Sequence, residues 1–222
     1  MTWLRGVRAI LAKDIRSEVR ARAALNAVVL FAAVTLAMVS YSIGGTSLSH
    51  EVHASLLWII VFFAAMAGLS RTFLVEAERG TELALKLTAS GSQVFVGKVL
   101  FNLALLVLLD LVVVPLFQIL LPIREANWGL LLTGLVLGSL ALAATATLVA
   151  AIVAQAGVKG ALFTVLSFPI LIPVLVPGVS TAKKAMDQIP ISGALTEIQL
   201  LVSYTGVMLT LALMLFDFVW RD

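Results

Sequence analysis

This chain of 222 residues contains no cysteine and few charged residues. Without cysteine it has no disulfide framework, no thiol nucleophile and no cysteine-based metal site. Charged residues make up 12% of the chain and hydrophobic residues 61%, and the mean hydropathy is +1.11. This composition lies outside the range of soluble globular domains and is typical of an integral membrane protein.

Long apolar runs occupy nearly the whole sequence and leave no room for a soluble domain with its own core. A membrane-spanning helix needs roughly 20 mostly apolar residues. Six runs reach that length, at residues 23–43, 54–75, 99–121, 128–154, 161–178 and 196–219. The sequence therefore predicts an all-α membrane protein with six transmembrane helices, forming one permease domain over residues 1–222.

The lysines and arginines predict how the chain is oriented, because these residues accumulate in cytoplasmic loops. They are concentrated before the first run and between the second and third runs, whereas only Arg124, Lys183 and Lys184 fall on the other side. We therefore expect both termini to be cytoplasmic and residues 179–195 to form an outer loop. The net charge of +3 is explained by this topology, so it does not indicate binding to nucleic acid.

The N-terminal residues 1–22 carry an amphipathic pattern. Trp3, Val7, Ile10 and Ile15 recur at helical spacing with arginines between them. This pattern predicts a cytoplasmic helix that lies in the membrane interface with its basic face toward anionic lipid. The alternative is a basic arm that only sets the topology.

The fourth and fifth runs have unusual compositions. The fourth is rich in small residues such as Gly134, Gly138 and Ala141, which let helices approach closely, so we expect this span at the centre of helix packing or at a subunit contact. The fifth contains Pro169, Pro173 and Pro177. Three prolines four residues apart remove backbone donors along one face. They favour a broken element that opens toward the outside, and the alternative is a kinked but ordinary span.

The segment from Ser70 to Lys98 is the one long polar interruption between the apolar runs. It combines charged residues with leucines, so it carries both a solvated surface and an apolar surface that can dock on a partner. Its GSQVFVGKV stretch resembles a phosphate-binding loop only superficially, because the spacing is one residue too long and Val99 stands in place of the Ser or Thr. If this protein uses ATP, another chain must hydrolyse it, and we expect this chain to be non-catalytic.

Two polar features lie elsewhere. Asp110 is an acid deep inside a predicted span, which makes it a functional candidate by default. Two roles are open for Asp110, a structural hydrogen bond to a neighbouring helix and a role in transport or proton transfer. His50 and His53 are the only histidines in the sequence. They are either solvated polar residues or ligands of a metal or a haem iron. We predict no metal site.

Three segments together resemble one known family. They are LRGVRAILAKDIRSEVRARAALN at 4–26, FLVEAERGTELALKLTASGSQVFVGKVL at 73–100 and FPILIPVLVPG at 168–178. With the span count and the length, the chain resembles exporter-type ATP-binding-cassette membrane subunits. Among these it is most similar to the B subunit of the cytochrome c maturation system, the haem exporter permease family.

The resemblance implies a multi-pass permease of the bacterial inner membrane. Its implied partners are a cytoplasmic ABC ATPase, further membrane subunits that handle haem, and a periplasmic haem chaperone. The permease can also form a homodimer within the complex, and its surroundings are the lipid bilayer. Haem is then the handled substrate of the complex, and no cofactor is assigned to this chain. Residues 76–88 look like the coupling helix that fits the ATPase. The implied coupling residues are Glu76, Glu78, Arg79, Gly80, Glu82, Leu83 and Leu87.

The resemblance leaves two activities open, export of haem and ATP-driven release of the haem-loaded chaperone. Other functions also remain open at this point. They are an ABC permease for a lipid, a polysaccharide or a drug, an autonomous ion-coupled transporter that uses Asp110, and an assembly scaffold.

Overall fold

The structure is a computed structural model of the chain. It describes residues 3–45, 47–73, 76, 80–123, 125–155 and 161–221, with the backbone alone at residues 23, 82, 155, 161, 162, 164 and 217–221. In these ranges the chain forms helices and no strand. The helices are α1 Trp3–Ala21, α2 Ala23–Ile43, α3 His50–Leu69, α5 Glu82–Thr88, α6 Gly91–Leu120, α7 Trp128–Gln155, α8 Ala161–Met186, the short 3-10 helix η1 Ile191–Ala194, and α9 Leu195–Arg221.

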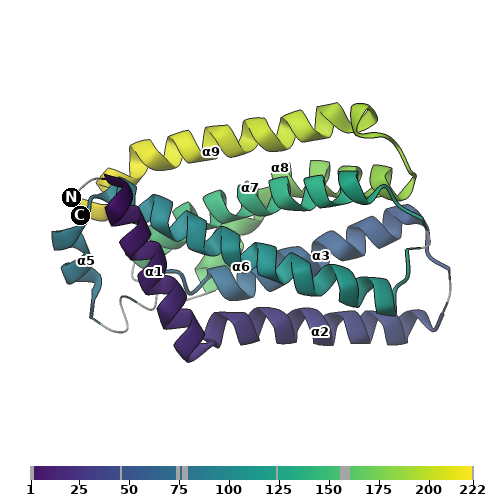
Figure 1. Cartoon of the computed structure of the whole chain (residues 1–222), viewed down its shortest axis with the longest axis horizontal. Coiled ribbons are helices and arrows are strands. Elements are labelled where there is room, and N and C mark those ends of the chain that lie inside the picture. The colour runs from purple at the N-terminus through teal and green to yellow at the C-terminus, as the bar shows by residue number, and fades with distance from the viewer. Residues whose placement is uncertain are drawn as a thin grey trace.

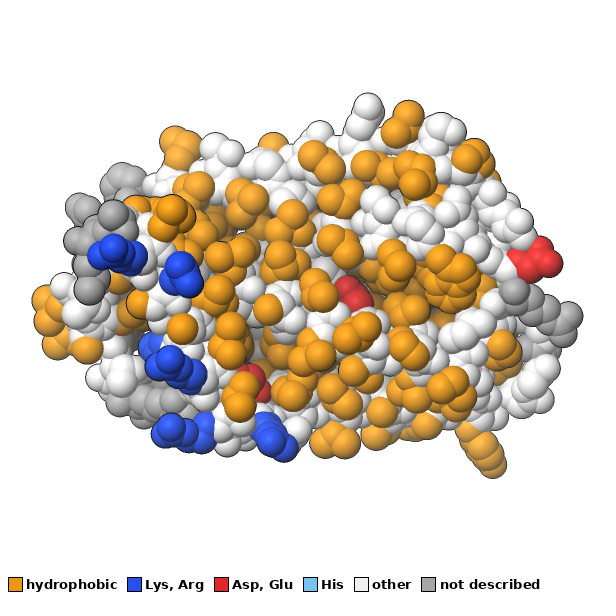
Figure 2. Space-filling model, viewed as in Figure 1, with side chains coloured by type: hydrophobic (Ala, Val, Ile, Leu, Met, Phe, Trp, Pro, Cys, Tyr) orange, Lys and Arg blue, Asp and Glu red, His pale blue; other side chains and the backbone are white. Residues whose placement is uncertain are grey.

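Within the described residues, six helices are long and apolar enough to cross a membrane, which confirms the predicted all-α class and span count. They are α2, α3, α6, α7, α8 and α9, and they lie side by side along the long axis of the molecule (Figure 1). Helix α1 crosses one end of this bundle, and α5 and both termini lie at the same end (Figure 1). Lysine and arginine side chains gather at that end on the face shown in Figure 2, whereas hydrophobic side chains cover the middle.

Serine caps determine where two of the spans begin. Ser49 Oγ accepts a hydrogen bond from the backbone N–H of Val52, so α3 begins at His50 instead of residue 54. Ser90 and Gln93 form a reciprocal capping box, in which each side chain accepts a hydrogen bond from the other residue's backbone N–H. This motif satisfies two free amides at a helix start, and α6 therefore begins at Gly91 instead of residue 99.

The amphipathic helix predicted near the N-terminus is present as α1 and packs on α6. Its Val7 and Ile10 are buried, and Ile10 lies so close to Gly97 of α6 that a Cβ built on Gly97 would be 2.7 Å from Ile10 Cγ2. The turn from α1 into α2 is made by Arg22, whose φ of 53° lies in the left-handed region. Glycine at position 97 thus allows the close approach of α1 to α6.

Helix α7 lies at the centre of the bundle, as its small residues predict. It packs against α6, α8 and α9, and 78% of an apolar 18-residue stretch of this helix is buried. The indole of Trp58 from α3 is 1% exposed and fills the space above Gly138 of α7 and Gly178 of α8. A Cβ on Gly178 would be 2.6 Å from this ring, and one on Gly138 would also collide with it.

The proline-rich fifth span is an unbroken helix, so the prediction of a broken element is wrong. Helix α8 includes Pro169, Pro173 and Pro177. Each proline removes only its own backbone donor, and at a spacing of four these losses fall along one face. Side chains bind carbonyl groups in this stretch, since Tyr204 Oη of α9 donates to the carbonyl of Ile170 at 2.5 Å. This bond joins α9 to α8, whereas the carbonyls freed by the three prolines are those four residues earlier, of Val165, Pro169 and Pro173.

Two further boundaries differ from the prediction. Helix α8 continues to Met186, so the outer connection expected at 179–195 is reduced to a short turn and η1. The expected single helix over 76–88 is interrupted at Gly80, which has a φ of 64°, and α5 begins at Glu82. The backbone N–H of Thr81 donates to the carbonyl of Glu76 at 3.0 Å.

Candidate functional site

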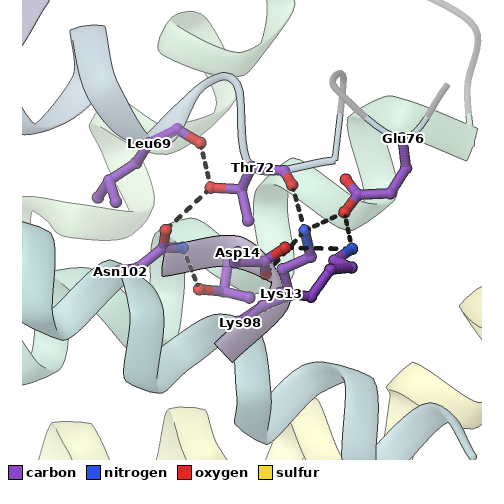
Figure 3. A network of polar contacts seen from close by, with 8 residues as sticks. Lys13, Asp14, Leu69, Thr72, Glu76, Lys98 and Asn102 are labelled. Atoms are coloured by element: carbon purple, nitrogen blue, oxygen red, sulfur yellow. Dashed lines mark hydrogen bonds and ion pairs between the residues drawn. The ribbon is translucent and has the colours of Figure 1, made fainter. Parts of the chain in front are cut away.

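Four charged side chains meet where α1 crosses the end of the bundle. This charge cluster consists of Lys13 and Asp14 from α1, Glu76 from the segment before α5, and Lys98 from α6 (Figure 3). Lys98 Nζ lies 2.5 Å from Glu76 Oε1 and 3.1 Å from Asp14 Oδ2. Lys13 Nζ lies 2.6 Å from the same Glu76 oxygen and 3.1 Å from Asp14 Oδ1. Three separate parts of the chain are therefore tied together by alternating charges.

The cluster is largely removed from water. The side chains of Lys98, Glu76 and Asp14 are 3%, 4% and 7% exposed, whereas Lys13 keeps 45% exposure. Burial alone would raise the pKa of Glu76, but Lys98 and Lys13 outweigh this effect and hold it below its usual value. Burial alone would lower the pKa of Lys13, but its contacts with Glu76 and Asp14 outweigh burial and hold that pKa above its usual value. The paired charged forms are thus the stable ones at neutral pH.

A chain of hydrogen bonds connects the charge cluster to the interior of the bundle. Lys98 Nζ donates to the backbone carbonyl of Thr72 at 2.9 Å. The Thr72 hydroxyl lies 2.7 Å from the carbonyl of Leu69 and 3.1 Å from Asn102 Oδ1, as Figure 3 shows. Asn102 Nδ2 in turn donates to Thr147 Oγ1 of α7 at 2.8 Å. The end of α3, helix α6 and helix α7 therefore share one buried polar network.

The predicted coupling residues separate into a buried part and an exposed part. Glu76 belongs to the charge cluster, whereas Glu78 and Arg79 lie outside the described residues. Gly80 makes the turn before α5, and Glu82 is the first residue of α5, with only its backbone described. The exposed part consists of the two leucines that follow.

Helix α5 presents an apolar strip away from the bundle. Leu83 and Leu87 are 68% and 78% exposed, and at a spacing of four they share one face. Leu85 faces the other way and packs against the core. The helix is therefore anchored on one side and offers two adjacent leucines on the other.

Sequence reasoning missed Asp14, Thr72 and Lys98 as parts of a site. The spacing offered one signal, because Asp14 follows Val7 and Ile10 on the face of α1 that is buried. A charged residue on the buried side of an amphipathic helix needs a partner of opposite charge. The partners of Lys98 come from segments distant in sequence, so no local pattern indicates them.

The intramembrane acid lies between two helices. Ser139 Oγ of α7 donates to Asp110 Oδ2 at 2.7 Å. Asp110 is 8% exposed, and its Oδ1 has no hydrogen-bond partner among the described residues. The structure thus places Asp110 in an interhelical hydrogen bond, and a role in transport stays a prediction.

The two histidines lie at the opposite end of the bundle from the charge cluster. His50 Nδ1 is 2.8 Å from Asp187 Oδ1 at the end of α8, and His53 Nδ1 is 3.2 Å from the carbonyl of Ser49. Both rings also line a cavity of about 460 Å³ between the ends of α2, α3 and α6. Each histidine therefore has one ring nitrogen engaged by an oxygen atom.

Comparison with known proteins agrees with this architecture. The family model described as CcmB protein matches residues 5–218. The chain belongs to the CcmB family. One relative is the heme exporter protein B of Rhodobacter capsulatus, which is 25% identical over 188 residues that cover 83% of this chain and 86% of the relative. The resemblance drawn from the three sequence segments is thereby confirmed, and with its six apolar helices this CcmB-family chain is a multi-pass membrane protein.

Proposed function

We propose that the chain is the permease subunit of an ATP-driven complex of cytochrome c maturation in the bacterial inner membrane. A partner ATPase hydrolyses ATP, and this chain couples that reaction to export of haem or to release of a haem-loaded periplasmic chaperone. The observation that carries the proposal is the family match over residues 5–218. The name of the relative from Rhodobacter capsulatus, heme exporter protein B, supports haem as the substrate.

The geometry of α5 supports a role in coupling. Its exposed leucines, Leu83 and Leu87, give a soluble partner an apolar surface at the end where the basic residues gather. Glu76, which precedes α5, is ion-paired with α1 and α6. A displacement of the segment around α5 would therefore pull on buried charges and be passed to α6. Such coupling requires two arrangements of the bundle that the ATPase binds with different affinity.

Co-expression with a candidate ABC ATPase subunit tests the proposal. We expect the double variant Leu83→Glu/Leu87→Glu to lose co-purification of the ATPase, because charged groups would be buried in an apolar contact. The matched control is Ile191→Glu, which places a charge on a residue of 46% exposure in η1, at the end of the bundle away from α5. Equal recovery of the ATPase with both variants would refute the assignment of α5.

The purified complex also tests the substrate. We expect it to contain a haem-handling membrane subunit and a haem absorbance band. A complex with an ATPase but with neither haem nor such a subunit would favour a permease for another substrate. Transport in liposomes without any ATPase would instead favour an ion-coupled transporter.

A further inference from the structure

A cavity of about 330 Å³ lies beside the charge cluster. Asp14 and Glu76 line its polar side together with Arg71, and Ala21 and Phe101 contribute apolar surface. It is located where α1 crosses the bundle end, and it is lined by Ala24, where one hydrophobic span begins, and by Gly68, near the end of another. This is the level at which lipid headgroups meet a transmembrane bundle.

Two acceptor atoms at the cavity are left without a hydrogen-bond donor from the described part of the chain. Lys98 Nζ donates hydrogen bonds to the Thr72 carbonyl and to Glu76 Oε1. By contrast, Glu76 Oε2 is buried and has no hydrogen-bond partner among the described residues. Asp14 Oδ2 lies within ion-pair distance of Lys98 but lacks hydrogen-bond geometry. Two buried carboxylate oxygens therefore lack a donor.

The charges around the cavity are balanced. Its lining contains three basic and three acidic side chains, Lys13, Arg71, Lys98, Asp14, Glu18 and Glu76. An anion alone would leave the two carboxylate oxygens without a donor, and a cation alone would leave Arg71 without an anion. A zwitterion, which brings a donor for the carboxylates and an anion for Arg71, keeps the balance.

We propose that this cavity binds the headgroup of an aminophospholipid. Its primary ammonium donates an N–H to Glu76 Oε2, its phosphate lies toward the exposed Arg71 guanidinium, and its glycerol part contacts Ala21 and Phe101. The decisive chemistry is the N–H donor, since a choline headgroup has the same charge but no N–H group to offer.

Competition between two lipids tests the proposal directly. The full-length chain, purified in detergent, is mixed with equal amounts of phosphatidylethanolamine and phosphatidylcholine with the same acyl chains, and retained lipid is counted by native mass spectrometry. We expect a preference of roughly tenfold for phosphatidylethanolamine, the lower end of the range for one charge-assisted hydrogen bond. Equal retention of the two lipids would overturn the proposal. Saturation by free ethanolamine without lipid enrichment would overturn it in favour of a soluble amine.

A pair of variants locates the effect. Ala21→Trp fills the cavity without removing any charge of the cluster. We expect it to abolish the preference for phosphatidylethanolamine over phosphatidylcholine. Ala12→Trp is the matched control, because Ala12 is also exposed on α1 but does not line this cavity, and it should keep the preference of the unmodified chain. A preference that survives Ala21→Trp would place lipid selectivity elsewhere and overturn the assignment of the cavity.

Discussion

Replacing Lys98 with methionine measures how much the charge cluster stabilises the fold. Methionine fills similar space but leaves Glu76 and Asp14, which are 4% and 7% exposed, with Lys13 as their remaining cation. Removal of one partner from a buried ion pair costs about 3–5 kcal/mol, because the other charge stays buried without compensation. Lys13 is 45% exposed, so solvent screens its attraction and it cannot replace Lys98. We therefore expect Lys98→Met to destabilise the protein by about 3–5 kcal/mol.

The measurement is reversible unfolding in mixed detergent, followed by circular dichroism of the helices. The control is Lys183→Met, which removes an exposed ion pair with Glu51 at 3.3 Å and should cost about 0–1 kcal/mol. The double variant Glu76→Gln/Lys98→Met removes one charge of each sign. It should therefore be more stable than the sum of the single variants predicts, by about 0.5–3 kcal/mol. A Lys98→Met variant no less stable than Lys183→Met, or strict additivity in the double variant, would refute the reasoning.

Three further outcomes follow from the structure. Gly138→Ala should destabilise by about 1–3 kcal/mol because its methyl group would overlap Trp58, whereas Gly206→Ala, with open space around it, should be neutral or stabilising in the same unfolding assay. Tyr204→Phe should cost about 0.5–1.5 kcal/mol through loss of the hydrogen bond to the backbone of α8, and no change in midpoint would contradict this. Because the folded-state pKa of Glu76 is lowered, its stabilisation is present above its ordinary value of 4.5 and is lost as the pH falls through the folded-state value. The unfolding midpoint should thus decline below pH 4.5, and Glu76→Gln should flatten that decline.

The sequence was sufficient for the number of spans and the central position of α7, because both depend on local composition. Span length follows from the apolar runs, and close packing follows from the small residues of α7. Helix ends were less predictable. Ser49 and Ser90 cap helices through single hydrogen bonds, which move a boundary by several residues without changing the hydropathy.

The charge cluster and the intact α8 depend on contacts between distant parts of the chain. Lys98 meets Asp14 only because α1 folds back across α6. No local sequence pattern indicates that crossing. Prolines weaken a helix in isolation, but α8 packs against α3, α7 and α9, and its own composition does not show those contacts. Local patterns therefore indicated the polar segment, but they did not show the interruption of its helix at Gly80 or the ion pairs of Glu76.

The contact of Trp58 with two glycines constrains how the bundle can move. Three helices meet at this indole with no room for a methyl group on either Gly138 or Gly178, so α3 cannot slide along α7 or α8 without a steric clash. Trp58 lies eight residues from the start of α3, which is about 12 Å at 1.5 Å per residue. If α5 receives a displacement from the ATPase, as we propose, α3 would then tilt about Trp58 and would not slide. The part of α3 between Trp58 and His50 is shorter than the part between Trp58 and Leu69. The His50 end would therefore move through a smaller arc than the end near α5.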